Sequence, residues 1–169
     1  MTQYKPFQRF VQKFASTRPG AWFGSHALHH FDRWIFRLSG GRATLTSHIA
    51  GFPMVIMTTT GAKSGLTRTT PLVAIREGVG DSCFALIASN WGQDHHPGWY
   101  HNLKANPSAT GTIEGVSRTY RAHEASGEEY DYFWQRASQT YLGYTLYKQR
   151  VGDRRIPILV LEAEPESRS

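Results

Sequence analysis

One short segment carries the clearest anion-binding chemistry in the chain. It reads TTTGAKSGLTRTTPL over residues 58–72. Gly61 and Gly65 flank a Lys-Ser pair, so the backbone can turn sharply enough for its N–H groups to converge on one anion. Lys63, Ser64 and Arg68 add two cations and a hydroxyl, which are donors suited to phosphate. The residue types therefore predict a phosphate cradle.

The segment differs from the phosphate loop of nucleotide triphosphatases. That motif has a longer spacing between its first glycine and its Gly-Lys pair and is followed by a helix, whereas a strand is expected here. A second interpretation stays open at this point. An isolated Lys-Ser-Gly is most often an ordinary hairpin loop with solvated cations.

A second segment, residues 88–107, combines small, polar and aromatic residues. It reads ASNWGQDHHPGWYHNLKANP and runs from the end of an expected strand into an expected helix. A strand that ends in small residues leaves room for a planar ring beside the backbone, and backbone amides there can bond to ring carbonyls. We therefore expect a pocket for a flat conjugated ligand.

Histidines raise the question of a metal site. They include His26, His29 and His30, with His95, His96 and His101 downstream. Two of them are four residues apart, but the acidic residue that a zinc hydrolase requires is missing from the pattern. We expect surface or packing histidines and no metal. Nothing in the sequence resembles a Ser-His-Asp or Cys-His arrangement closely enough to predict covalent catalysis.

Composition favours a folded, cationic protein. The 169 residues are 40% hydrophobic and 13% aromatic, with a net charge of +6 and a pI near 9.7. Such a charge attracts nucleic acid, anionic lipid or a polyanionic small molecule, and the charge alone does not choose among them. We find no nucleic-acid-binding motif, so nucleic acid is not the expected partner.

The single cysteine and the N-terminus bear on localisation. Cys83 can form no internal disulfide, which favours a reducing compartment, and no apolar stretch is long enough to span a bilayer. We expect a cytoplasmic protein. Phe7, Phe10, Val11 and Phe14 follow helical spacing with basic residues between them, so this stripe either lies on a membrane surface or packs on its own domain.

The elements that position these segments follow from periodicity. Residues 22–38 are predicted to be helical, and a second helix is expected over 128–147. Predicted strands cover residues 54–60, 69–76, 82–89, 109–113, 116–123 and 156–162, with a short helix over 99–105. This order predicts a mainly β, antiparallel split β-barrel with flanking helices. We expect one domain over 22–164, an N-terminal segment over 1–21 and a polar tail over 165–169.

Together, the two segments resemble the signature motifs of the deazaflavin-dependent nitroreductases. The matching runs are Thr-Thr-Thr-Gly-x-Lys-Ser-Gly-x-x-Arg-x-x-Pro-Leu and Ala-Ser-Asn followed by Pro-x-Trp-Tyr-x-Asn-Leu-Lys-Ala-Asn-Pro. The resemblance implies a split barrel that binds coenzyme F-420, a deazaflavin, with FMN the less expected cofactor. It also implies that the first segment holds the phosphate and oligoglutamate tail.

Matching positions imply which residues meet the cofactor. The tail is assigned to Ala62, Lys63, Ser64 and Arg68. The adjoining wall is assigned to Thr69, Thr70, Pro71, Leu72 and Val73. The ring is assigned to Ile87, Ala88, Ser89 and Asn90. The remaining segment comprises Gly98, Trp99, Tyr100, His101 and Asn102.

Three tyrosines form the expected acceptor pocket. In similar enzymes a late helix supplies tyrosines, and Tyr141, Tyr144 and Tyr147 recur here every third residue. Tyr144 is expected either to donate a proton or to hold the acceptor carbonyl, with the Ser89 hydroxyl as a second donor to developing negative charge. The alternative is that these tyrosines simply pack against the barrel.

Two departures from the family pattern affect the expected activity. Ala62 stands where many relatives have arginine, and Trp91 replaces an expected glycine and is placed at the substrate pocket. The primary hypothesis is hydride transfer to an electron-poor acceptor such as a quinone, an enone or a nitroaromatic. The alternative is a non-catalytic carrier of the cofactor or of a hydrophobic ligand on the same barrel.

Overall fold

The computed structural model describes residues 53–165 except 79 and 142. The predicted N-terminal segment, the helix over 22–38 and the histidines at positions 26, 29 and 30 lie outside the described residues. The described residues comprise the strands of the barrel and the helices that lie between those strands in the sequence.

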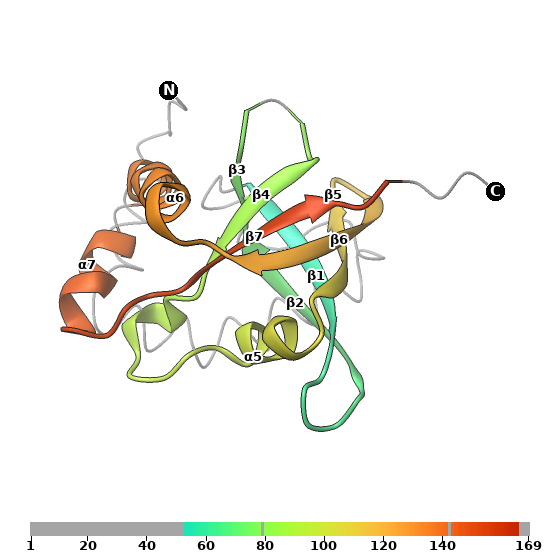
Figure 1. Cartoon of the computed structure of the whole chain (residues 1–169), viewed down its shortest axis with the longest axis horizontal. Helices are drawn as coiled ribbons and strands as arrows, with labels where there is room; N and C mark the ends of the chain where they lie inside the picture. The colour runs from blue at the N-terminus through green and yellow to red at the C-terminus, as the bar shows by residue number, and fades with distance from the viewer. Residues whose placement is uncertain (1–52, 79, 142, 166–169) are drawn as a thin grey trace.

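Seven strands form one curled antiparallel sheet (Figure 1). The strands are β1 (Met54–Thr60), β2 (Thr67–Val73), β3 (Ile75–Arg76), β4 (Cys83–Ile87), β5 (Ser108–Ile113), β6 (Val116–Glu124) and β7 (Ile158–Ala163). Their order across the sheet is β2-β1-β5-β6-β7-β4-β3. The predicted antiparallel split barrel is confirmed.

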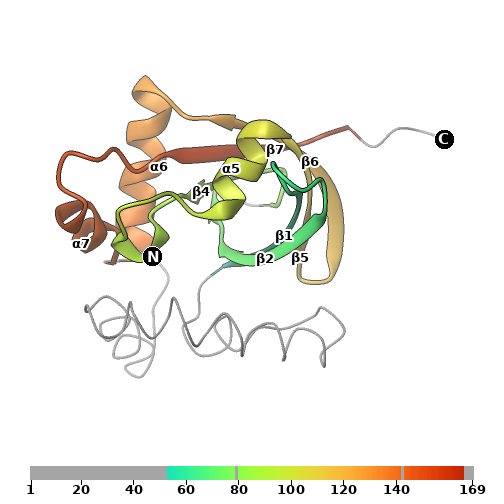
Figure 2. The ribbon, with the colours of Figure 1, turned by 90° about the horizontal axis from the view of Figure 1, so that it is seen from below.

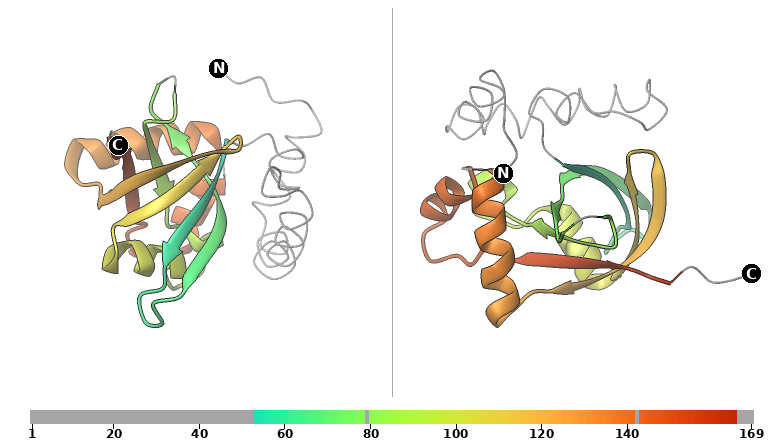
Figure 3. Two further views of the ribbon diagram at one scale, coloured as in Figure 1. Left: turned by 90° about the vertical axis from the view of Figure 1, so that its right-hand side faces the viewer. Right: turned by 90° about the horizontal axis from the view of Figure 1, so that it is seen from above.

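The strands at the two edges of the sheet, β2 and β3, follow one another in the sequence. β2 pairs with β1, while β3 pairs with β4, and only Ala74 separates them. Ala74 is fully buried, and its N–H donates to Pro53 O at 2.8 Å. The segment 67–76 therefore leaves one sheet edge and joins the other, which curls the sheet into a barrel (Figure 3).

Successive side chains of β4 and β7 point alternately into two hydrophobic cores, one inside the barrel and one beneath the helices. Phe84 and Leu86 of β4 point into the barrel with Leu159 and Leu161 of β7. The intervening residues of both strands pack against helices outside the barrel. β4 and β7 are therefore apolar on both faces, which explains why their sequences read as continuous hydrophobic runs instead of alternating ones.

Three helices complete the described fold. They are α5 (Gly98–Ala105), α6 (Gly127–Thr140) and α7 (Gly143–Arg150), and a short 3-10 turn, η2, covers Asn90–Gly92. α6 and α7 lie on the outer face of β4 and β7, and α5 lies across one end of the barrel (Figure 2). None of the helices in the described part of the chain is long and apolar enough to cross a membrane.

The prediction of one helix over 128–147 is wrong. α6 ends at Thr140, and Tyr141 adopts an extended backbone with φ −146° and ψ 113°. A Cβ on Gly143 would collide with the Tyr141 ring, so glycine is required where α7 begins beside that ring. The break turns the chain so that α7 packs on η2, which a straight helix could not do.

Antiparallel pairing places the two sequence motifs at the same end of the barrel. β1 ends at Thr60 where β2 begins, β2 and β3 run to the opposite end, and β4 returns to finish at Ile87. β5 then starts at Ser108 beside this end. We call it the α5 end, because α5 spans the gap between β4 and β5 (Figure 1).

The loop between η2 and α5 is held by one arginine. Arg154 donates to Gln93 O at 2.7 Å and to His96 Nδ1 at 2.8 Å. Since a guanidinium can only donate, Nδ1 is the acceptor and His96 is a neutral imidazole with its proton on Nε2. Burial, followed by the charge of Arg154, lowers the pKa of His96 below its usual value.

Replacing Gly111 tests the barrel core. A Cβ at this position would lie 2.8 Å and 3.0 Å from two ring carbons of Tyr120 and 3.3 Å from Val55. Gly111→Ala should lower the free energy of unfolding by about 1–3 kcal/mol, because a buried aromatic ring must shift. Gly98→Ala is the control, since nothing lies within 4 Å of its added methyl. Equal denaturation midpoints for both variants would contradict the packing described here.

The His96–Arg154 contact predicts a pH dependence of stability. Because the pKa of His96 is lower in the folded state, the unfolded chain binds more protons as pH falls below about 6.5. The stabilisation is present above that pH and is lost as pH falls toward the folded-state pKa. Urea titrations between pH 7.5 and 5 should show a shallower loss for His96→Gln than for wild type. His123→Gln controls for histidine replacement elsewhere, and parallel profiles for wild type and His96→Gln would refute the contact.

Candidate functional site

The loop between β1 and β2 closes tightly over Gly61. Its N–H donates to Leu66 O at 2.9 Å, and its carbonyl accepts from Gly65 N at 2.8 Å. A Cβ on Gly61 would lie 2.7 Å from Ser64 Oγ and 3.8 Å from Arg68 Cγ. The side chains of Ser64 and Arg68 therefore both lie beside this glycine.

Backbone donors remain available at the tip of the loop. The N–H of Ala62 bonds to Asn102 Oδ1 at 3.0 Å, and the N–H of Leu66 to Ser64 Oγ at 3.3 Å. The N–H groups of Lys63 and Ser64 have no partner among the described residues, and both residues are exposed. Two adjacent free amides beside a hydroxyl form the kind of concavity that binds an anion.

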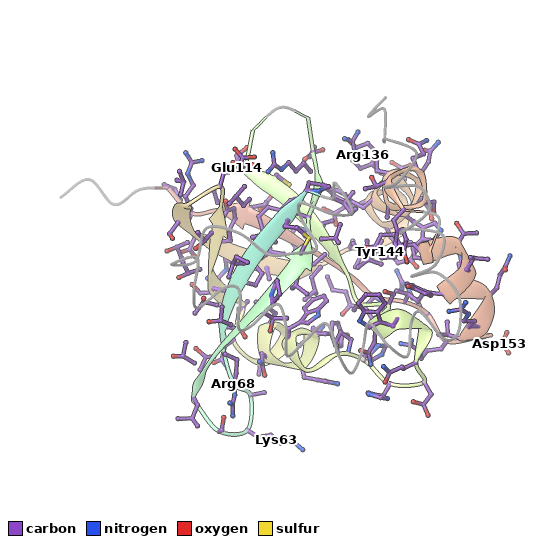
Figure 4. All side chains as sticks on the ribbon, turned by 180° about the vertical axis from the view of Figure 1, so that it is seen from behind. Lys63, Arg68, Glu114, Arg136, Tyr144 and Asp153 are labelled. Atoms are coloured by element: carbon purple, nitrogen blue, oxygen red, sulfur yellow. The ribbon has the colours of Figure 1, made fainter. Side chains whose placement is uncertain are left out.

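The charges of the loop are not compensated locally. Neither Lys63 nor Arg68 forms an ion pair within the part of the chain that the structure describes. The sequence contains no Asp or Glu between Arg33 and Arg76. Figure 4 shows both cations at the hairpin, with Lys63 pointing outward from its tip. The loop thus has a net positive field, although Lys63 does not close over Gly61 as Ser64 and Arg68 do.

The predicted wall, Thr69 to Val73, is β2 itself. Thr69 Oγ1 lies 3.3 Å from Thr58 Oγ1 on the adjacent strand. Leu72 packs on the core inside the barrel, and Val73 packs on the core beneath the helices. The residues Thr69, Thr70 and Pro71 are exposed or partly buried. Because side chains alternate along a strand, these five residues cannot all face one ligand.

Ser89 lies two residues after the last residue of β4, at the α5 end of the barrel. It is 6% exposed, and its hydroxyl has no hydrogen-bond partner among the described residues. Ile87 and Ala88 before it are buried. Asn90 and Trp91 after it have φ of 48° and 58°, a left-handed conformation that costs non-glycine residues on the order of 1–3 kcal/mol each. Left-handed backbone at two consecutive non-glycine residues is found preferentially at functional sites.

Most of the predicted residues of α5 make contacts within the protein. Trp99 lies in the barrel core, and Tyr100 donates to Glu124 Oε2 at 3.1 Å. Lys104 donates to the same oxygen at 2.9 Å, and this bond is the main cause of the lowered pKa of Glu124. His101 is exposed beside the Tyr100 ring, and Gly98 begins the helix. These contacts fix α5 across the α5 end.

The three tyrosines form one buried cluster despite the helix break. The ring centroids of Tyr141 are 5.3 Å from Tyr144 and 5.9 Å from Tyr147, edge to face. The hydroxyls of Tyr141 and Tyr147 lie 2.9 Å apart. Burial raises the pKa of all three phenols. The Tyr144 hydroxyl has no hydrogen-bond partner among the described residues, whereas the hydroxyls of Tyr141 and Tyr147 contact each other.

Trp91 connects the strained turn to this cluster. Its ring centroid is 6.5 Å from that of Tyr147, at an interplanar angle of 60°. Gly92 packs so closely on Tyr147 that a Cβ there would lie 3.3 Å from a ring carbon. The indole is partly buried against the tyrosines. Ser89, Trp91 and the cluster therefore form one continuous region, which the sequence alone did not show.

Three contributors to this site were missed from the sequence. Thr59, 3% exposed, accepts from Asn102 Nδ2 at 3.1 Å and lies 3.4 Å from Arg68 O. Glu124 and Arg154 hold α5 and the loop before it. Each acts across a long sequence separation, and a threonine in a β-branched run signals only a strand. Among the described residues no group of three or more His, Cys, Asp and Glu could hold a metal ion.

Comparison with protein families identifies one matching model. The F420H(2)-dependent quinone reductase family matches residues 30–163. An F420H(2)-dependent quinone reductase of Mycobacterium tuberculosis (strain H37Rv) is 36% identical over 132 residues, covering 75% of this chain and 84% of that protein. A second, putative, quinone reductase from the same strain is 31% identical over 116 residues, covering 66% of this chain and 94% of that protein.

Solved structures agree with this match. An F420-H2 dependent reductase (FDR-A) shares 38% identity with a TM-score of 0.59, covering 65% of this chain and 94% of that one. A structure described as a domain-swapped dimer shares 32% identity with a TM-score of 0.61, covering 85% of this chain and 99% of that one. The resemblance to deazaflavin-dependent split-barrel reductases is confirmed: the chain belongs to the F420H(2)-dependent quinone reductase family.

Proposed function

We propose that this chain binds coenzyme F-420 and transfers a hydride from its reduced form to a quinone. The observation that carries the proposal is the shared location of two features. A loop whose cations form no ion pair and whose tip amides have no hydrogen-bond partner among the described residues lies at the same barrel end as Ser89, a residue 6% exposed that follows β4. Family membership supports the same chemistry.

The donor set fits a deazaflavin with an anionic tail. Arg68, Ser64 and the amides of the loop tip suit phosphate oxygens, and Lys63 suits the more distant carboxylates of the tail. Ala62 provides no side-chain charge, so its position contributes only an amide that is already bonded to Asn102. A longer, multiply charged tail fits this loop better than the single phosphate of FMN does.

The reaction needs a proton as well as an oriented acceptor. When bound, the reduced cofactor would supply the hydride. A quinone that gains a hydride becomes a hydroquinone monoanion, and water supplies the proton that completes the hydroquinone. Burial raises the pKa of the Tyr144 phenol, so its hydroxyl donates a hydrogen bond to the anionic oxygen and keeps its own proton, and the Ser89 hydroxyl is a second hydrogen-bond donor.

Trp91 and the tyrosines set the width of the acceptor site in this proposal. The indole of Trp91, two residues after Ser89, packs on Tyr147. Flat quinones can stack beside such aromatic edges. Enones and nitroaromatics stay predictions for the same site.

Turnover is the direct test of the proposal. Purified protein should oxidise reduced F-420 when a naphthoquinone or benzoquinone is added, measured by the return of the oxidised cofactor's absorbance. Reactions without quinone, without protein and with reduced FMN are the controls. If the protein binds F-420 but never accelerates its oxidation across several quinones, it is a carrier and the reductase proposal fails.

Substitutions of the two hydroxyl donors test their assignment. Tyr144→Phe and Ser89→Ala should each lower kcat on the order of 10²-fold, because charge developing on the acceptor oxygen loses a donor. Tyr132→Phe is the control, since this tyrosine is exposed on α6. Steady-state kinetics at saturating cofactor measures the effect. An unchanged kcat in both variants would show that neither hydroxyl takes part in the reaction.

A further inference from the structure

The side-chain amide of Asn102 makes two hydrogen bonds to the β1–β2 hairpin, one through its oxygen and one through its nitrogen. Its Oδ1 accepts from the Ala62 N–H at 3.0 Å, and its Nδ2 donates to Thr59 Oγ1 at 3.1 Å. These partners are 40 and 43 residues away in sequence. Asn102 sits in the middle of α5, which Trp99 and Leu103 anchor in the barrel core.

A further hydrogen bond links β1 to β2 where the two strands enter the hairpin loop. Thr59 Oγ1 lies 3.4 Å from Arg68 O, and it can donate there because it accepts from Asn102. Thr59 and Arg68 are paired across β1 and β2. One chain of bonds therefore runs from the Ala62 amide through Asn102 and Thr59 to the backbone of Arg68.

This chain fixes the part of the loop that presents the free donors. Ala62 immediately precedes Lys63 and Ser64, whose amides have no partner among the described residues. Without the bond to Asn102, the Ala62 peptide could rotate, and the orientation of the N–H groups of Lys63 and Ser64 would change with it. The loop amides that remain are fixed only by short-range bonds within residues 61–66.

We infer that Asn102 is a positioning residue: it holds the loop 61–66 in its anion-binding conformation from α5 and does not itself bind the deazaflavin ring. The inference deepens the proposed function and rests on it for the identity of the ligand. It predicts that binding of the anionic tail depends on Asn102, whereas binding of the ring does not.

Two forms of the ligand separate these roles. The first is complete F-420, and the second is the same deazaflavin chromophore without phosphate and glutamates. Asn102→Ala should raise the Kd for complete F-420 about tenfold or more, since two hydrogen bonds that order the loop are lost. The Kd for the tail-less chromophore should stay within about twofold. Fluorescence titration measures both, and in turnover the KM for reduced F-420 should rise while kcat at saturation stays nearly constant.

Variants of Thr59 and Asn106 control the interpretation. Thr59→Val removes the hydroxyl at nearly constant shape and should reproduce the effect of Asn102→Ala, whereas Thr59→Ser should restore wild-type binding. The double variant should lose less than the product of the two single losses, because both act through one chain of bonds. Asn106→Ala removes only a 3.5 Å contact to Thr60 O and should change neither Kd by more than about threefold.

A measurement without cofactor tests the loop itself. In the free protein, amide hydrogen exchange at Ala62 should be faster in Asn102→Ala and Thr59→Val than in wild type, and unchanged in Asn106→Ala. Unaltered exchange at Ala62 would overturn the inference. An equal loss of affinity for both ligands would also overturn it, because Asn102 would then bind the ring. Failure of wild-type protein to bind F-420 would instead refute the proposed function, and exchange at Ala62 would still decide whether Asn102 holds the loop.

Discussion

The architecture depends on one continuous segment that pairs with two different strands. Residues 67–76 form β2 against β1 and then, after the buried Ala74, β3 against β4. This switch joins the two edges of the sheet, so that β4 finishes at the end where the hairpin loop lies and Ser89 follows it there. Without the switch, the cationic loop and the serine would belong to opposite edges of an open sheet, and no single ligand could contact both.

The α5 end combines a rigid frame with a small number of unsatisfied donors. α5 is attached to the barrel at three points: by Trp99 in the core, by the bonds of Tyr100 and Lys104 to Glu124, and by Asn102 to the hairpin. Against this frame, the amides of Lys63 and Ser64 and the hydroxyls of Ser89 and Tyr144 have no hydrogen-bond partner among the described residues, so these donors are available to a ligand.

The same frame explains why aromatic residues are abundant in a small protein. β4 and β7 are covered on both faces, so the chain must fill a barrel interior and a second layer beneath α6 and α7. Tyr141 and Tyr147 satisfy each other's hydroxyls inside that second layer. Tyr144 shares their packing, but its hydroxyl bonds to neither of them.

Local sequence predicted the strands well, because β-branched and apolar runs such as Met54–Thr60 differ clearly from the glycine-bearing turns between them. It also predicted the two segments that meet at the α5 end, since their donors and small residues are chemically distinctive. It could not predict the break at Tyr141, because no proline marks it and the extended backbone follows from packing against Gly143. The bonding of Asn102 was equally hidden, because its partners lie 40 and 43 residues earlier.

A crystal structure of the full chain with bound F-420 would test the central claim most directly, namely that one ligand connects the hairpin loop with the Ser89 strand. The account predicts phosphate oxygens within hydrogen-bonding distance of the Lys63 and Ser64 amides, with the ring beside Ser89 and within reach of the Tyr144 hydroxyl. A tail bound elsewhere, for example along the exposed Arg118 and Arg121 of β6, with the loop empty, would contradict it.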